Sequence, residues 1–190
     1  MIVPIAATVV LGGALTVAAY TDCRWGIIPN WLTYPGMLAG LAFWAVAGWA
    51  TDGWASAGAQ AGGAAVALLV GLVPFMVLRL IGVVGGGDAK LMGLIGAWTG
   101  MWQSVVATVF YSCFIVLAMA VIVMVVQGKV RQTAQRIWLL LVSSAAGARD
   151  AAPSDSPRLP FGLALALAGL LAALEHVIGL ELPWSRYSAF

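Results

Sequence analysis

The sequence predicts an all-α integral membrane protein with six transmembrane helices, a short fourth helix and both termini outside. Composition is the first reason. Of the 190 residues, 63% are hydrophobic and only 8% are charged, whereas soluble domains carry roughly 25% charged residues. The mean hydropathy is +1.01. Because so few charges cannot coat a water-facing surface, the composition argues against an ordinary soluble domain.

A series of apolar segments is the second reason. Each is close to the roughly 20 residues that a helix needs to cross a bilayer. Asp22 and Arg24 follow the first segment, and no Lys or Arg precedes it. A secretory signal peptide has the opposite charge pattern, so we expect a retained helix. The long apolar segments are 2–20, 31–50, 61–81, 104–126 and 159–180.

A shorter apolar piece at 91–102 is expected to form the fourth helix. At 1.5 Å per residue it spans about 18 Å, short of the roughly 30 Å hydrocarbon core. It either starts one long helix that reaches Val126 or forms a short helix that turns at 99–103. Gly100, flanked by Trp98 and Trp102, favours the turn because Trp gathers at membrane interfaces.

The basic residues orient the helices. With six helices, successive connections alternate sides, and only Arg186 of the nine Lys and Arg falls on the second side. Positive residues favour the cytoplasm, so we expect a multi-pass protein of the inner membrane. Five helices would separate Lys90 from Lys129 and lose this asymmetry. The basic residues on the cytoplasmic side are Arg24, Arg79, Lys90, Lys129, Arg131, Arg136, Arg149 and Arg158.

We expect one domain over residues 1–190, with a polar cytoplasmic segment at 127–158. In the first part of that segment, apolar residues at helical spacing alternate with Arg and Gln. This pattern predicts an amphipathic helix at the interface. Pro and Ser between 149 and 158 predict a linker.

The sequence offers no pattern for a metal or another cofactor. Cys23, Cys113 and the single His176 have neither metal-ligand nor disulfide spacing. We therefore expect no metal and no cofactor. With no histidine nearby in sequence, a thiol mechanism at Cys23 is also disfavoured. The net charge of +2 is too small to suggest nucleic acid as a partner.

Asp22 and Asp88 differ from the other acidic residues because each sits at the cytoplasmic edge of an apolar helix. Asp22 ends the first helix, and Asn30 is expected to cap the second. Asp88 opens the short fourth helix after three glycines, which allow unusual backbone angles and close approach of other groups. The remaining acidic residues are expected to be solvated: Asp52, Asp150, Asp155, Glu175 and Glu181.

Two carboxyl groups in one pocket share a proton, because one pKa rises. The ionised member can accept the proton of a water that attacks a peptide carbonyl, and the protonated member polarises that carbonyl. Spacing alone also permits two unrelated interface aspartates. A proton relay in a transporter or channel and an inactive scaffold are further alternatives. A relay predicts polar residues deeper in the helices, whose interiors hold few.

Three stretches resemble the motifs of type IV prepilin peptidases. The first is 22–33, DCRWGIIPNWLT, and the second is 85–90, GGGDAK, which matches the GxGD motif shared more loosely with presenilin-type proteases. The third is 158–162, RLPFG. The three motifs occur in order at the expected helix edges, and the resemblance covers nearly the whole chain.

The resemblance implies that Asp22 and Asp88 are the catalytic pair of a membrane aspartyl endopeptidase. Its substrates would be prepilins or pseudopilins with a basic leader, a Gly before the cut and a hydrophobic segment after it. Cleavage is expected at the cytoplasmic face. The implied partners are these substrates, the lipid bilayer and, through 127–158, pilus assembly machinery.

Five further residues are expected to support the pair. Arg24 and Lys90 each lie two positions from an aspartate, where a cation favours the ionised form. Cytoplasmic anchoring explains both residues equally well. Gly85 and Gly87 are expected to shape the loop. Pro160 is expected to fix the start of the last helix near the site, although the general preference for proline at helix starts explains it as well.

The connection 21–30 separates this chain from larger members of the family. Those carry an insertion there with paired CxxC motifs and also methylate the new N-terminus. A connection this short predicts that the methyltransferase function is absent. The chain most resembles the short branch that serves Flp/Tad-type pili, and archaeal preflagellin-type peptidases are also short.

Overall fold

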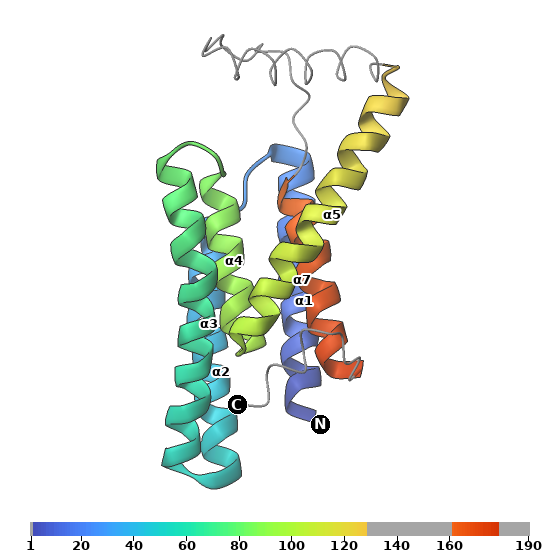
Figure 1. Cartoon of the computed structure of the whole chain (residues 1–190). Helices are drawn as coiled ribbons and strands as arrows, with labels where there is room; N and C mark the ends of the chain where they lie inside the picture. The colour runs from blue at the N-terminus through green and yellow to red at the C-terminus, as the bar shows by residue number, and fades with distance from the viewer. Residues whose placement is uncertain (1, 129–160, 179–190) are drawn as a thin grey trace. The chain divides into compact units, whose positions relative to one another are not determined.

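The computed structural model describes residues 2–128 and 161–178, and the secondary structure in these ranges is helical. The all-α prediction is therefore confirmed for them (Figure 1). The predicted amphipathic helix and linker, from residue 129 onward, and Pro160 lie outside the described residues. The helices are α1 (Ile2–Trp25), α2 (Asn30–Asp52), α3 (Trp54–Leu80), α4 (Gly86–Thr99), α5 (Trp102–Val126) and α7 (Phe161–Ile178).

Three of the described helices are long and apolar enough to cross a membrane: α1, α3 and α5. The apolar part of α7, Phe161–Glu175, is shorter. These helices, like the composition, are those of a membrane protein. The six-span topology and the outside location of both termini stay predictions.

The turn between α4 and α5 decides between the two predictions for the short apolar piece at 91–102, one long helix or a short helix followed by a turn. Gly100 ends α4 in the left-handed region at φ 69°, and its N–H bonds to the carbonyl of Gly96. A single helix reaching Val126 is therefore excluded. The Trp98 side chain does not face the surface of the protein, because it is only 6% exposed. Its indole N–H donates to the carbonyl of Gly36 at 2.9 Å, which satisfies the group inside the protein.

The short helix α4 is the centre of the core. Every residue from Leu91 to Thr99 is buried, and α4 packs against α1, α2, α3 and α7. A helix that is apolar all round needs such surroundings. Small residues make the packing close, since a Cβ on Gly71 of α3 would overlap the backbone of Met92.

Four of the other described helices form two pairs around α4. In Figure 1, α1 lies beside α7, and α2 lies beside α3. The chain divides into two compact units, Met1–Cys113 with Pro160–Phe190, and Phe114–Leu159. Helix α5 continues from the first unit into the second. All residues of the candidate site described below belong to the first unit.

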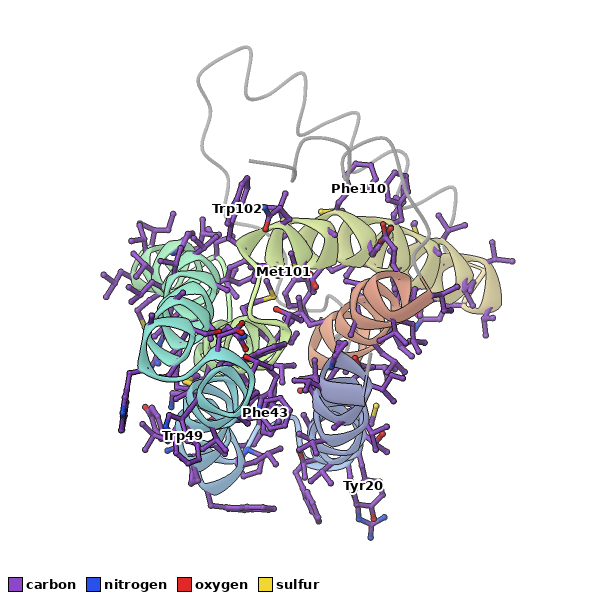
Figure 2. All side chains as sticks on the ribbon, turned by 90° about the horizontal axis from the view of Figure 1, so that it is seen from below. Tyr20, Phe43, Trp49, Met101, Trp102 and Phe110 are labelled. Carbon is purple, nitrogen blue, oxygen red and sulfur yellow. The ribbon has the colours of Figure 1, made fainter. Side chains whose placement is uncertain are left out.

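Aromatic side chains of the first unit fall into two sets, one facing the core and one facing outward. Tyr20, Trp49 and Trp102 are exposed and project away from the helices of the first unit (Figure 2). Phe43 instead packs against the buried ring of Trp98, with 5.5 Å between ring centroids. The outward set suits lipid contact or the membrane interface.

Candidate functional site

The candidate site is a cavity of about 340 Å³ at one end of the first unit. It lies where α1 and α3 end and where α2 and α4 begin. Asp22 and Asp88 both line it, together with Arg79 and Lys90. Since a liquid water occupies about 30 Å³, the cavity has room for on the order of ten waters. Asp22 and Asp88 therefore line one cavity that is large enough for water.

The inward face of α1 carries Asp22 to this cavity. Residues three or four apart on a helix share a face, and Asp22 is the next position on the buried stripe of α1. That stripe packs against α7. The Asp22 Oδ2 atom accepts a hydrogen bond from the Leu163 N–H at 3.3 Å. The buried stripe consists of Ala7, Leu11, Leu15 and Ala18.

Asp88 is the third residue of α4 and is partly buried. Its carboxyl group turns back toward Gly85, the residue before the helix, so that it caps the helix start. Asp88 lies outside the three candidate spans. Burial, and next the negative charge of Asp22, raise the pKa of Asp88 from 3.8 to about 6, against a lowering by a backbone hydrogen bond with Gly85.

The three glycines before Asp88 each make room for a different neighbour. A Cβ on Gly85 would lie 2.7 Å from Asp88 Oδ2, and one on Gly87 would lie 3.1 Å from the Cβ of Ile28. A Cβ on Gly86 would overlap the Arg79 guanidinium. None of the three has a positive φ. The expectation of close approach is met, whereas the expectation of unusual backbone angles is wrong.

Lys90 links the start of α4 to the start of α2. Its Nζ donates a hydrogen bond to Asn30 Oδ1 at 2.6 Å and lies 4.9 Å from the ring centroid of Tyr34. The predicted capping role of Asn30 is therefore wrong: Pro29 occupies the N-cap position, and Asn30 is the first helical residue. The Asn30 side chain instead accepts the hydrogen bond from the Lys90 ammonium group.

Arg24 does not share this arrangement. It is exposed, and its guanidinium lies 6.0 Å from the ring centroid of Trp25. It is not among the residues that line the cavity. Of the two cations expected beside the aspartates, only Lys90 reaches the cavity.

Sequence reasoning assigned no role to four residues that shape the site. Arg79 lines the cavity, and Ile28 is buried between the glycine loop, residues 85–87, and α7. A Cβ on Gly162 would lie 2.7 Å from Asp22 Oδ2, and Leu163 donates to the same oxygen. Gly162 belongs to the third sequence motif, and this motif was the signal that could have identified it as a site residue.

The expectation that Glu175 is solvated, which concerns a position away from the site, is wrong. Glu175 is not a solvated flanking residue, because the Tyr111 hydroxyl donates a hydrogen bond to its Oε2 at 2.6 Å. Asp52 is exposed at the end of α2, as expected. Within 2–128 and 161–178, His, Cys, Asp and Glu side chains form no group of three that is able to hold a metal ion.

Comparison with known families identifies the chain. The model of the type IV leader peptidase family matches residues 9–121, which is more than half of the sequence. The matched region contains Asp22, Asp88 and the glycine loop. Comparisons with curated protein sequences and with solved structures gave no match. The family match confirms the resemblance to prepilin peptidases, and this chain belongs to the type IV leader peptidase family.

Proposed function

We propose that the protein is a membrane aspartyl endopeptidase that removes the leader from Flp-type prepilins or pseudopilins at the cytoplasmic face. Membership of a leader peptidase family supports prepilin-type substrates. The single observation that carries the aspartyl mechanism is the shared cavity of Asp22 and Asp88. The charge of Asp22 contributes to a pKa of about 6 at Asp88, which suits a pair that holds one proton between two carboxyl groups.

In the proposed reaction, Asp88 carries the proton and Asp22 is the proton acceptor. A water in the cavity transfers a proton to Asp22 as its oxygen attacks the scissile carbonyl carbon. Asp88 donates its proton to the carbonyl oxygen, which gives a neutral tetrahedral diol. The diol then collapses: one hydroxyl proton returns to Asp88, the proton on Asp22 passes to the leaving nitrogen, and the C–N bond breaks. The leader leaves with a new carboxyl group and the pilin with a new amino group.

Two features support the finer assignments. The connection between α1 and α2 is only residues 26–29, which leaves no room for a methyltransferase insertion and favours the short Flp/Tad-type branch. Arg79 and Lys90 line the cavity with the aspartates, and basic residues favour the cytoplasmic side. A basic leader would stay on that side while its hydrophobic segment enters the bilayer.

The test uses purified protein in detergent and a recombinant Flp-type prepilin. Asp22→Asn and Asp88→Asn keep the shape of each side chain and remove its acid–base chemistry. Each is expected to lower kcat by about a thousandfold or more. Asp52→Asn is the matched control, because Asp52 is exposed at the end of α2 and outside the cavity lining.

Two outcomes would contradict this proposal. Cleavage by either cavity variant at more than about a tenth of the wild-type rate would exclude the two-aspartate mechanism. A second substrate series compares Flp-type prepilins with prepilins of other type IV systems under the same conditions. Equal kcat/KM for both would remove the Flp-type assignment while leaving leader peptidase activity in place.

A further inference from the structure

We infer that the first turn of α7 is a positioning element for Asp22, which it holds by one carboxylate oxygen so that the other accepts the proton of the attacking water. This inference rests on the proposed function. It assigns roles to Gly162 and to the backbone N–H of Leu163, which lie outside the region matched by the family. Neither residue lines the cavity, so each acts through Asp22.

The hydrogen bond to Asp22 uses a donor that α7 itself cannot satisfy. The first four N–H groups of a helix have no partner within the helix, and Leu163 is the third residue of α7. Its N–H donates to Asp22 Oδ2 at 3.3 Å. The start of a helix also carries partial positive charge, which favours a carboxylate there. The contact therefore fixes the orientation of the Asp22 side chain.

Gly162 allows this contact because it has no side chain. A Cβ at this position would lie 2.7 Å from Asp22 Oδ2 and 2.8 Å from its Cγ, closer than real Cβ atoms approach such neighbours. It would also lie 3.0 Å from Ile28 Cδ1. Any larger residue at 162 must push the carboxylate away from α7.

Ile28 connects this contact to the loop that carries Asp88. Its side chain is buried and faces Gly162 on one side and Gly87 on the other, where a Cβ would lie 3.1 Å from the Cβ of Ile28. The three sequence motifs thus meet at Ile28. A shift of α7 therefore changes the placement of both carboxyl groups.

A helix cap that serves only stability is the competing explanation. It predicts that losing the N–H lowers the melting temperature and leaves kcat unchanged well below that temperature. A positioning role predicts a lower kcat with KM unchanged. The charged groups that share the cavity with Asp22 are Asp88, Arg79 and Lys90, and α7 has no titratable side chain before Glu175. The variants below leave all of these in place.

Leu163→Pro is the decisive variant, with Leu163→Ala as its matched control. Proline removes the N–H, and a proline in the first turn breaks no intrahelical hydrogen bond. Alanine removes the side chain and keeps the N–H. For Leu163→Pro we expect kcat to fall on the order of tenfold with KM unchanged. Leu163→Ala should keep the wild-type kcat and KM.

Gly162→Ala tests the same contact by steric displacement, and Gly13→Ala on α1 is its control because a Cβ there meets nothing within 4 Å. We expect the same fall in kcat with KM unchanged for Gly162→Ala only. If Leu163→Pro does not fold, Gly162→Ala decides by this readout, and an unchanged kcat overturns the inference. Equal losses in Leu163→Pro and Leu163→Ala would overturn it as well.

The two proposals fail in distinguishable ways. Retained cleavage by Asp22→Asn or Asp88→Asn removes the two-aspartate mechanism itself. Loss of cleavage in both, combined with a wild-type kcat in Leu163→Pro, removes only the positioning role of α7.

Discussion

At the residue scale, the site keeps two acidic side chains in one cavity by giving them different surroundings. Asp22 meets an N–H at the start of α7, whereas Asp88 turns back onto the start of its own helix. Burial and the charge of Asp22 disfavour a second negative charge at Asp88. Pairs whose environments differ in this way divide into a proton donor and a proton acceptor.

The pH dependence of cleavage follows from the pKa of Asp88. This pKa is raised from 3.8 to about 6, so Asp88 stays protonated in a range where an ordinary aspartate is ionised. If Asp88 is the proton donor, kcat/KM falls as pH rises through about 6, because the free enzyme loses the required proton. Initial rates with a prepilin substrate between about pH 4.5 and about pH 8.5 measure this limb.

Asp52→Asn again serves as the control and should show the same fall of kcat/KM with rising pH as the wild-type protein. A kcat/KM that stays flat or rises over this range would mean that Asp88 is not the proton donor.

At the element scale, the position of Asp88 depends on how closely α4 packs against its neighbours. Small residues of α3 face α4, and among them Gly71 meets the backbone of Met92. On α4, a Cβ at Gly96 would overlap the backbone of Ala67. Backbones that approach this closely gain packing contacts in an apolar environment, where small residues are favoured at helix interfaces.

Two glycines of α3 make a matched pair for testing this packing. Gly71→Ala inserts a methyl group against the Met92 carbonyl, and overpacking costs about 1–3 kcal/mol. We expect a lower melting temperature in detergent and, because α4 carries Asp88, a lower cleavage rate. Gly62→Ala places its Cβ in open space and should keep or raise the melting temperature, since alanine stabilises a helix relative to glycine by about 1 kcal/mol.

Thermal unfolding followed by circular dichroism measures both variants. An unchanged melting temperature for Gly71→Ala would show that α3 can move away from α4 at little cost, and the close-packing explanation would then be wrong.

At the scale of the whole molecule, the side of the membrane that holds the cavity determines which part of a prepilin reaches it. Asp52 precedes the first residue of α3 and Val83 follows its last residue. The two therefore lie at opposite ends of this helix, which is one of the candidate spans. Val83 is on the cavity side, in the α3–α4 connection, and is 67% exposed. The distribution of basic residues predicts that this side is cytoplasmic.

Single-cysteine labelling tests this orientation. In a background without Cys23 and Cys113, Asp52→Cys should react with an impermeant thiol reagent in intact spheroplasts, and Val83→Cys should not. Both should react after permeabilisation, which is the control for accessibility. The reverse pattern in intact spheroplasts would place the aspartates outside and exclude cleavage at the cytoplasmic face.

The sequence by itself determined the helical segments and the two aspartates that the structure brings to one cavity. Apolar composition is a local property, so it identifies α1, α3 and α5 as lengths of chain suited to a bilayer. Helix periodicity is local as well, and it is why Asp22 continues the buried stripe of α1. The GxGD motif identified Asp88 and its glycines because short motifs are contiguous in the chain.

Only the tertiary structure decided which groups meet across the site. Leu163 and Asp22 are 141 positions apart, and Lys90 and Asn30 are 60 apart. A hydropathy pattern predicts the environment of a residue from its distance to the end of a helix. It contains no information on which residue of another helix lies opposite. For this reason Glu175, which bonds Tyr111, and Asn30, which accepts a hydrogen bond from Lys90, were predicted incorrectly. The contacts that orient the two carboxyl groups arise from helix packing, which no local pattern in the chain encodes.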